Sequence, residues 1–148
     1  MAVREVIFRG KRVDNGEWVY GYYFKATHHW HNRGIHKDWI ATDTVQNGGW
    51  CNVRGKYAVI PETVGQYTGL LDKDGKKVFE GDILAFSDRL VYVHWHDYCG
   101  CWDCSYIKAI DDKPTLHEER SPSKWRYNAE VIGNIHDNKE LLEVNQCY

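Results

Sequence analysis

Short runs of alternating β-branched and aromatic residues, separated by turn-forming residues, recur along the whole chain. In the segment Glu17 to Phe24, Trp18, Tyr20, Tyr22 and Phe24 fall on one side of an extended backbone, because successive side chains of a strand point to opposite faces. The preceding Asp14, Asn15 and Gly16 contain the Asn-Gly pair that is typical of a tight hairpin turn. This pattern favours strands over helices and predicts a β-rich fold.

The same features predict strands at Val3 to Arg9, Glu17 to Phe24, Trp39 to Val45, Lys56 to Ile60, Thr63 to Tyr67, Ile83 to Phe86, Arg89 to His96, Cys101 to Lys108 and Glu130 to His136. Turns or loops are predicted at Gln46 to Gly49, Leu70 to Lys77, Asp97 to Gly100 and Ala109 to Lys124, the last with a helical turn at Thr115 to Arg120. Asn138 to Val144 is predicted as a short helix that needs docking to be stable.

Many short strands without a long amphipathic helix predict an all-β domain, either a small antiparallel barrel or a sandwich. The step from Gly81 and Asp82 into an apolar strand, followed by the VYVHW hairpin, resembles the way in which SH3-like barrels enter a strand. The 148 residues contain no linker rich in Gly, Ser or Pro, so one domain over residues 1–148 is expected. The aromatic content, 7 Trp, 10 Tyr and 4 Phe, is high enough to fill its core.

The charge of the chain is nearly balanced. Nineteen Lys and Arg against 21 Asp and Glu give a net charge of -2, so no overall positive field attracts nucleic acid or anionic lipid. No apolar run is long enough to span a membrane, and the N-terminus lacks the apolar core of a secretory signal. The five cysteines are therefore expected to be reduced thiols in a cytoplasmic protein.

Residues 60–84, IPETVGQYTGLLDKDGKKVFEGDIL, resemble the signature of the YopX family, small proteins encoded mostly by bacteriophages and prophages. REVIFRGKRVDNGEWVYGYY at residues 4–23 and EVIGNIHDNKELL at residues 130–142 fit the same pattern. The resemblance implies a β-rich fold and a phage or prophage setting inside a bacterial host cell. It transfers no catalytic residue, because the family has no assigned biochemical activity. The segments THHWHNRGIH at 27–36 and CGCWDC at 99–104 depart from the family pattern.

The cysteine-rich segment is a candidate metal site. Cys99, Cys101 and Cys104 together with His94 or His96 would supply the four ligands of a tetrahedral zinc ion. In a strand from Cys101 to Lys108, however, Trp102, Cys104 and Tyr106 share one face and Cys101 lies on the other. Free cysteine is also a common small core residue, so packing is favoured over ligation, and no zinc or other cofactor is expected.

A second cluster consists of His28, His29, His31 and His36, which could bind a transition metal. No cysteine or carboxylate at a recognised spacing completes this set, so a polar surface loop is the favoured interpretation. A thiol enzyme would place Cys99 or Cys101 beside His94 or His96. Phosphate-binding glycine-rich motifs, HExxH and GxSxG are absent from the sequence, which favours a protein without catalytic residues.

These observations favour an accessory or protein-interaction module that contacts a protein partner or a second copy of itself. The alternative is a nucleic-acid-binding β-barrel that stacks bases on surface aromatics. Its basic residues would be Arg4, Arg9, Lys11 and Arg12, or Lys73, Lys76 and Lys77. The net charge argues against this alternative, and specific binding to nucleic acid is expected to be weak at physiological salt.

The predicted binding residues are Trp30, His31 and Trp50, which lie in polar segments rich in Gly or His. Trp30 and Trp50 are expected to be exposed, and exposed Trp is enriched among interface hot spots. Trp18, Tyr20, Tyr22 and Trp95 lie on regular strand faces and are expected to be core residues.

Overall fold

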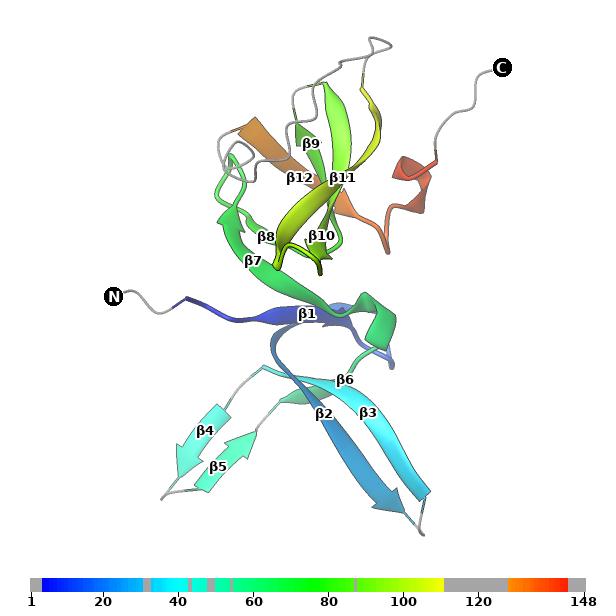
Figure 1. Ribbon diagram of the computed structural model, residues 1–148. Coiled ribbons are helices and arrows are strands. Elements are labelled where there is room, and N and C mark those ends of the chain that lie inside the picture. The colour runs from blue at the N-terminus through cyan, green and yellow to red at the C-terminus, as the bar shows by residue number, and fades with distance from the viewer. Residues whose placement is uncertain are drawn as a thin grey trace. The chain divides into compact units, whose positions relative to one another are not determined.

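The computed structural model describes residues 4–30, 33–42, 44–47, 50–53, 55–86, 88–110 and 128–143 (Figure 1). The strands are β1 (Phe8–Lys11), β2 (Trp18–Trp30), β3 (Arg33–Ala41), β4 (Thr44–Asn47), β5 (Trp50–Val53), β6 (Lys56–Ala58), β7 (Gly65–Leu71), β8 (Lys77–Phe79), β9 (Asp82–Phe86), β10 (Arg89–His96), β11 (Cys101–Ala109) and β12 (Ala129–Asn134). The elements also include the short 3₁₀ segments η1 (Pro61–Thr63) and η2 (Lys139–Leu141). The predicted all-β class is confirmed.

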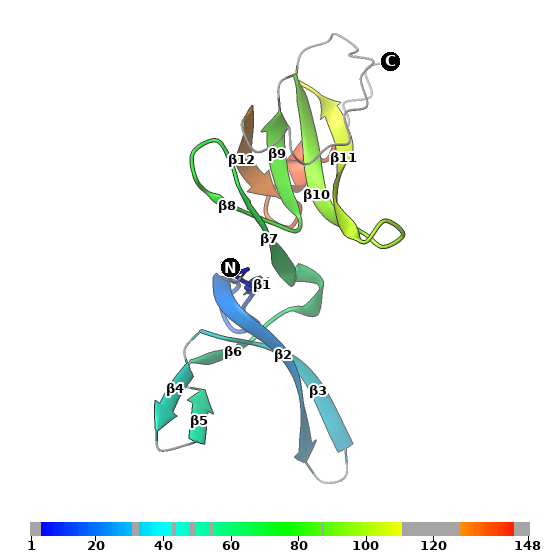
Figure 2. The same ribbon diagram turned by 60° about the vertical axis from the view of Figure 1, so that its left-hand side comes forward.

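The chain divides into two compact units, residues 1–67 and residues 68–148. In the first unit, β2 pairs antiparallel with β1 on one side and with β3 on the other, and β3 also pairs with β6 (Figure 2). The first residues of β7 pair with β1, and the strand then continues into the second unit, where β8 is its next neighbour. β4 and β5 form a separate two-stranded hairpin.

The core of the first unit lies on one face of its sheet. Val19 of β2, Ile40 of β3 and Val59 after β6 form a buried cluster, and the side chains of Phe8, Tyr23, Tyr57 and Val64 pack against it. An isolated bridge between Arg12 and Val59 connects the end of β1 with the residue after β6. Gly21 is required by the close approach of β2 to β3, because a Cβ at this position would lie 2.0 Å from the Ala41 carbonyl oxygen.

The second unit is built on an antiparallel sheet in the order β11-β10-β9-β12. One face carries a buried cluster, called the main cluster below, of Val78, Leu84, Val91, Val93, Ala129 and Val131. A second cluster contains Ile83, Leu90 and Ile107. Leu141 and Leu142, in and just after η2, pack against the second cluster, so the C-terminal segment docks through apolar contacts as its length requires. Neither this sheet nor the sheet of the first unit closes into a barrel within the described residues.

Buried polar side chains hold the turns of the second unit. Asp72, only 6% exposed, accepts hydrogen bonds through Oδ1 from the backbone N–H groups of Asp74 and Lys76, each at 2.9 Å. Its Oδ2 accepts another from the N–H of Val131 in β12, at 3.1 Å. Asp82 Oδ2 accepts the Phe79 N–H at 2.8 Å, which secures the turn between β8 and β9.

Most predicted strands are present, with shifted ends. β10 has the predicted bounds, Arg89–His96, whereas β2 continues to Trp30 and β1 begins only at Phe8. The predicted loop Leu70 to Lys77 is shorter than expected, because β7 extends to Leu71 and β8 begins at Lys77. The interior of the predicted loop Ala109 to Lys124, from residue 111, lies outside the described residues.

The prediction that Tyr20 and Tyr22 are core residues is wrong. These side chains are 49% and 58% exposed, and Trp18 is half-buried. The buried face of β2 is the opposite one, which carries Val19 and Tyr23. Tyrosine tolerates this position because its ring ends in a hydroxyl that can remain hydrated.

The prediction that Trp95 is a core residue is also wrong, since its side chain is 42% exposed. On the partner strand, Trp102 and Cys104 pack against the main cluster as their shared face predicts, but Tyr106 is exposed. β11 also contains a bulge beyond Tyr106: Leu90 pairs with Lys108 and Val91 pairs with Tyr106, so Ile107 has no opposite residue. Ile107 is buried with Ile83 and Leu90 in the second cluster, on the other side of the strand from Trp102 and Cys104.

Candidate interaction surface

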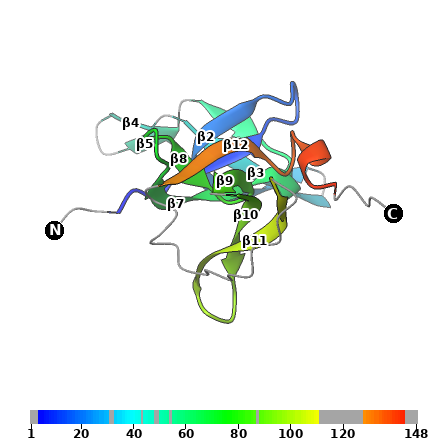
Figure 3. The ribbon, with the colours of Figure 1, turned by 90° about the horizontal axis from the view of Figure 1, so that it is seen from above.

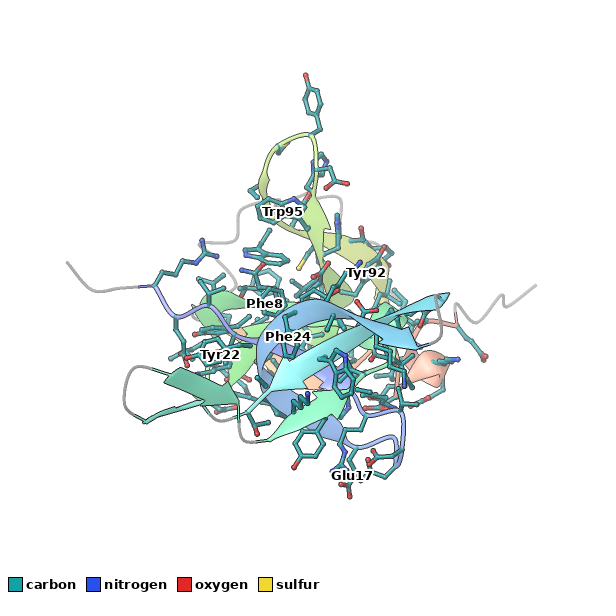
Figure 4. All side chains as sticks on the ribbon, turned by 90° about the horizontal axis from the view of Figure 1, so that it is seen from below. Phe8, Glu17, Tyr22, Phe24, Tyr92 and Trp95 are labelled. Atoms are coloured by element: carbon teal, nitrogen blue, oxygen red, sulfur yellow. The ribbon has the colours of Figure 1, made fainter. Side chains whose placement is uncertain are left out.

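The outer face of the first unit's sheet is rich in aromatic residues. Tyr20 and Tyr22 lie two residues apart on the same face of β2, and both are exposed. We call this pair the tyrosine face. Trp18 and Phe24 flank it along the strand, and Figure 4 labels Tyr22 and Phe24 among the side chains of β2.

Cations from neighbouring strands lie over the indole rings at the borders of the tyrosine face. The guanidinium carbon of Arg9 lies 4.7 Å from the centre of the Trp18 ring, and Lys11 Nζ lies 5.6 Å from it. On the other side, Lys56 Nζ lies 5.4 Å from the Trp39 ring. The antiparallel register explains the first contacts, because Lys11 is directly opposite Trp18 and Arg9 is opposite Tyr20.

The predicted basic groups are largely engaged within the protein. Arg9 is buried, and Arg12 forms a two-point ion pair with Asp14 through contacts of 2.9 and 2.6 Å. In the second group, Lys73 Nζ lies 2.7 Å from Glu130 Oε2. The positive charge available to a phosphate backbone is therefore smaller than the sequence alone indicates.

The β10–β11 hairpin of the second unit extends beyond β9, which pairs with β10 only from Arg89 to Tyr92 (Figure 3). Towards its turn, Trp95 and Trp102 are directly opposite each other, with ring centres 5.0 Å apart in an edge-to-face arrangement. Figure 4 shows Trp95 close to the projecting end of the hairpin. In the turn itself, Tyr98 is 96% exposed.

The cysteines of this hairpin occupy two different environments. Cys104 is partly buried against the main cluster, and this burial, together with the nearby Asp103, raises the pKa of its thiol. Cys99 and Cys101 are exposed, so the packing interpretation holds only for Cys104. Partial desolvation, Cys99 and Asp103 also raise the pKa of Cys101, which disfavours the nucleophilic thiolate.

The histidines beside these cysteines bind other partners. His94 Nε2 lies 3.0 Å from Ser105 Oγ, and His96 Nδ1 accepts the Cys99 backbone N–H at 3.2 Å. Within the described part of the chain, no three His, Cys, Asp or Glu side chains are arranged to hold a metal ion. The same residues contain no helix that is long and apolar enough to cross a membrane.

The contact roles expected for the predicted binding residues stay predictions. Trp30 is the last residue of β2 and Trp50 the first of β5, but their side chains lie outside what the structure describes. His31 lies outside the described residues altogether, as do the side chains of His28, His29 and His36. The tyrosine face was missed, although Lys11, opposite Trp18 on β1, was a usable signal that this side faces solvent.

A family model described as YopX protein matches residues 7–143. The chain belongs to the YopX family. The crystal structure of protein EF1440 from Enterococcus faecalis is similar to this YopX-family chain, with a TM-score of 0.54 and 25% sequence identity over 95% of this chain and 100% of that one. A search of curated proteins found no match.

The residues that carry the YopX resemblance perform structural roles in this chain. Asp72 and Asp82 belong to the central signature, and both hold turns through their carboxylates. In the closing segment, Asn134 Oδ1 accepts the backbone N–H groups of His136 and Asp137, at 3.0 and 2.9 Å. Family membership therefore accounts for the fold and indicates no biochemical activity.

Proposed function

We propose that this YopX-family chain is a protein-interaction module, encoded in a phage or prophage setting, that contacts its partner through the tyrosine face. The observation that supports this most directly is the exposure of Tyr20 and Tyr22 next to each other on one rigid strand. Large aromatic rings gain much by desolvation, and tyrosine is enriched at protein interfaces and among hot spots.

The surroundings of the tyrosine face define the partner's chemistry. Lys11 and Lys56, over Trp18 and Trp39, place positive charge at two borders of the aromatic surface. A partner that presents an apolar patch with acidic residues at its rim matches this arrangement, because rim charges of opposite sign favour encounter and orientation.

The test begins with cross-linking and affinity purification from bacterial cells that express the chain, followed by titration of the purified chain with the recovered protein. The double substitution Tyr20→Ala/Tyr22→Ala should weaken binding about tenfold or more while the thermal melting temperature stays close to that of the parent. Tyr106→Ala is the matched control, since Tyr106 is equally exposed on the other unit. Analytical ultracentrifugation of the parent and of the same variants, without a partner, shows whether the chain self-associates through the tyrosine face.

Trp30→Ala, His31→Ala and Trp50→Ala test the contact residues predicted from sequence. Loss of binding in these variants, with Tyr20→Ala/Tyr22→Ala unaffected, would place the contact away from the tyrosine face and overturn the assignment. If the chain remains monomeric and binds no protein, the proposal that it is a protein-interaction module is wrong.

Single-stranded nucleic acid is the second candidate, and the cations over Trp18 and Trp39 are the observation that favours it. The ion pairs of Arg12 with Asp14 and of Lys73 with Glu130 weigh against nucleic-acid binding, because they neutralise part of the positive charge. A fluorescence titration with mixed-sequence oligonucleotides at about 150 mM salt separates the two candidates. Sub-micromolar binding that is lost in Tyr20→Ala/Tyr22→Ala would replace the protein partner by a nucleic acid.

A further inference from the structure

The turn of the β10–β11 hairpin brings two thiols together. His96 and Cys101 are paired across the hairpin, and residues 97–100 connect them. The Gly100 N–H donates to the His96 carbonyl at 2.8 Å, and the Cys99 N–H donates to His96 Nδ1 at 3.2 Å. Gly100 has a φ of 61°, in the left-handed region that glycine adopts readily. The backbone around both cysteines is thus held by His96.

The two thiols of this turn are accessible and adjacent. Cys99 and Cys101 are both exposed, and only Gly100 separates them along the chain. Cys104 is set apart from them, because it lies on the face of β11 that packs against the main cluster. The pair is therefore distinct from the third cysteine in both exposure and direction.

We propose that Cys99 and Cys101 form a reversible dithiol–disulfide site that is oxidised by a small-molecule disulfide such as glutathione disulfide. Two residues separated by one other residue have Cα atoms at most roughly 7 Å apart, and a disulfide requires roughly 4.4–6.8 Å. The left-handed Gly100 bends the chain between them and brings this distance below its extended limit.

The reaction is a thiol–disulfide exchange in two steps. One thiolate attacks a sulfur of glutathione disulfide, which breaks its S–S bond, releases one glutathione thiolate and leaves a mixed disulfide on the protein. The second thiolate then attacks the protein sulfur of the mixed disulfide, which closes the Cys99–Cys101 bond and releases the second glutathione. The protein loses two electrons to glutathione disulfide, and the two thiol protons pass through solvent to the released thiolates.

Formation of the disulfide affects the end of the β10–β11 hairpin. Tyr98, which is almost fully exposed, directly precedes Cys99. A Cys99–Cys101 bond closes a small ring next to it and fixes the backbone that presents the tyrosine ring to solvent. The oxidation state of the site thereby changes the shape of the most projecting part of the second unit's sheet.

The test uses the full chain and tryptic mapping. The protein is incubated with glutathione disulfide, its remaining thiols are alkylated, and the peptide spanning residues 90–108, which contains all three cysteines of the segment, is weighed. The parent and Cys104→Ala should yield this peptide with two hydrogens missing, and dithiothreitol should restore the reduced mass. Cys99→Ser and Cys101→Ser should abolish the oxidised form while retaining the parent's melting temperature.

Three results would overturn the proposal. The first is an oxidised peptide that persists in Cys99→Ser or Cys101→Ser, because the bond would then involve Cys104. The second is a parent peptide that stays reduced although both thiols react with iodoacetamide. The third is a covalent dimer on a non-reducing gel that contains these cysteines, since that bond joins two chains.

Discussion

Asp72 is a buried carboxylate whose oxygens serve the backbone. Burial alone would raise its pKa, but hydrogen bonds from the N–H groups of Val131, Lys76 and Asp74 outweigh this effect, and the pKa lies below the usual value. The negative charge is thus stabilised inside the fold by peptide dipoles. One side chain connects the turn after β7 with β12, far along the chain.

Replacing Asp72 with Ala should therefore be costly. It removes the acceptor of three backbone N–H groups, and the Val131 N–H is left in a buried position. We expect the free energy of unfolding to fall by about 3 kcal/mol, measured by urea denaturation. Asp74→Ala, at an exposed position in the same turn, should change it by less than about 0.5 kcal/mol. If both substitutions lower the free energy of unfolding equally, the buried carboxylate of Asp72 is not the source of the stabilisation.

We expect the stability of the first unit to depend on pH in the alkaline range because of Tyr23. Desolvation and the hydrogen bond to Asp38 raise the pKa of its phenol from 10.0 to about 12, so the folded state favours the neutral form. The stabilisation is fully present below the unfolded pKa and is lost as the pH rises from 10 through 12. Unfolding measured at about pH 9 and again near pH 11.5 should show a steeper loss for the parent than for Tyr23→Phe. Parallel curves for the two proteins would contradict the assignment.

Neighbouring residues of β11 differ in burial close to the bulge of that strand. Ile107 lies in the cluster with Ile83 and Leu90, whereas Tyr106 is 62% exposed. Ile107→Ala should lower the free energy of unfolding by roughly 2–5 kcal/mol, the usual range for a buried Ile, and Tyr106→Ala should leave it nearly unchanged. Thermal or urea denaturation checks this pattern, and a larger loss for Tyr106→Ala than for Ile107→Ala would contradict it.

At the level of elements, the sequence predicts where strands lie better than which way they face. β10 was located to the residue, because its alternation ends at the clear turn from Asp97 to Gly100. β8 was missed, because its three residues follow the polar stretch that forms the preceding turn. The bulge at Ile107 is a property of strand pairing, and no local pattern in β11 reveals it.

The tyrosine face was mistaken for core because aromatic residues were counted as apolar. The hairpin turn at Asn15 and Gly16 sets the register that places Lys11 opposite Trp18, and charged partners indicate a solvent-facing side. Among the candidate site residues, the separation of Cys104 from Cys101 followed from strand alternation. The closeness of Cys99 and Cys101 did not, because it depends on the conformation of the turn.

For the molecule as a whole, the two units have separate buried clusters but share β7. If the chain is a single domain, as predicted, it should unfold in one cooperative transition, because β7 contributes residues to both units. We expect Val19→Ala and Leu84→Ala, one in each cluster, to reduce the hydrogen-exchange protection of both β2 and β10 amides. If each substitution affects only its own unit, the chain consists of two independently unfolding parts.

The continuity of β7 also determines where the polypeptide can be divided. A break in the exposed turn between Lys73 and Lys76 leaves the whole of β7 on the N-terminal fragment, while β8, its neighbour in the sheet, stays on the C-terminal one. Each fragment then presents a strand edge whose neighbour in the sheet belongs to the other fragment. We expect the two halves to reassemble by strand complementation, and a tag placed on each half would report it.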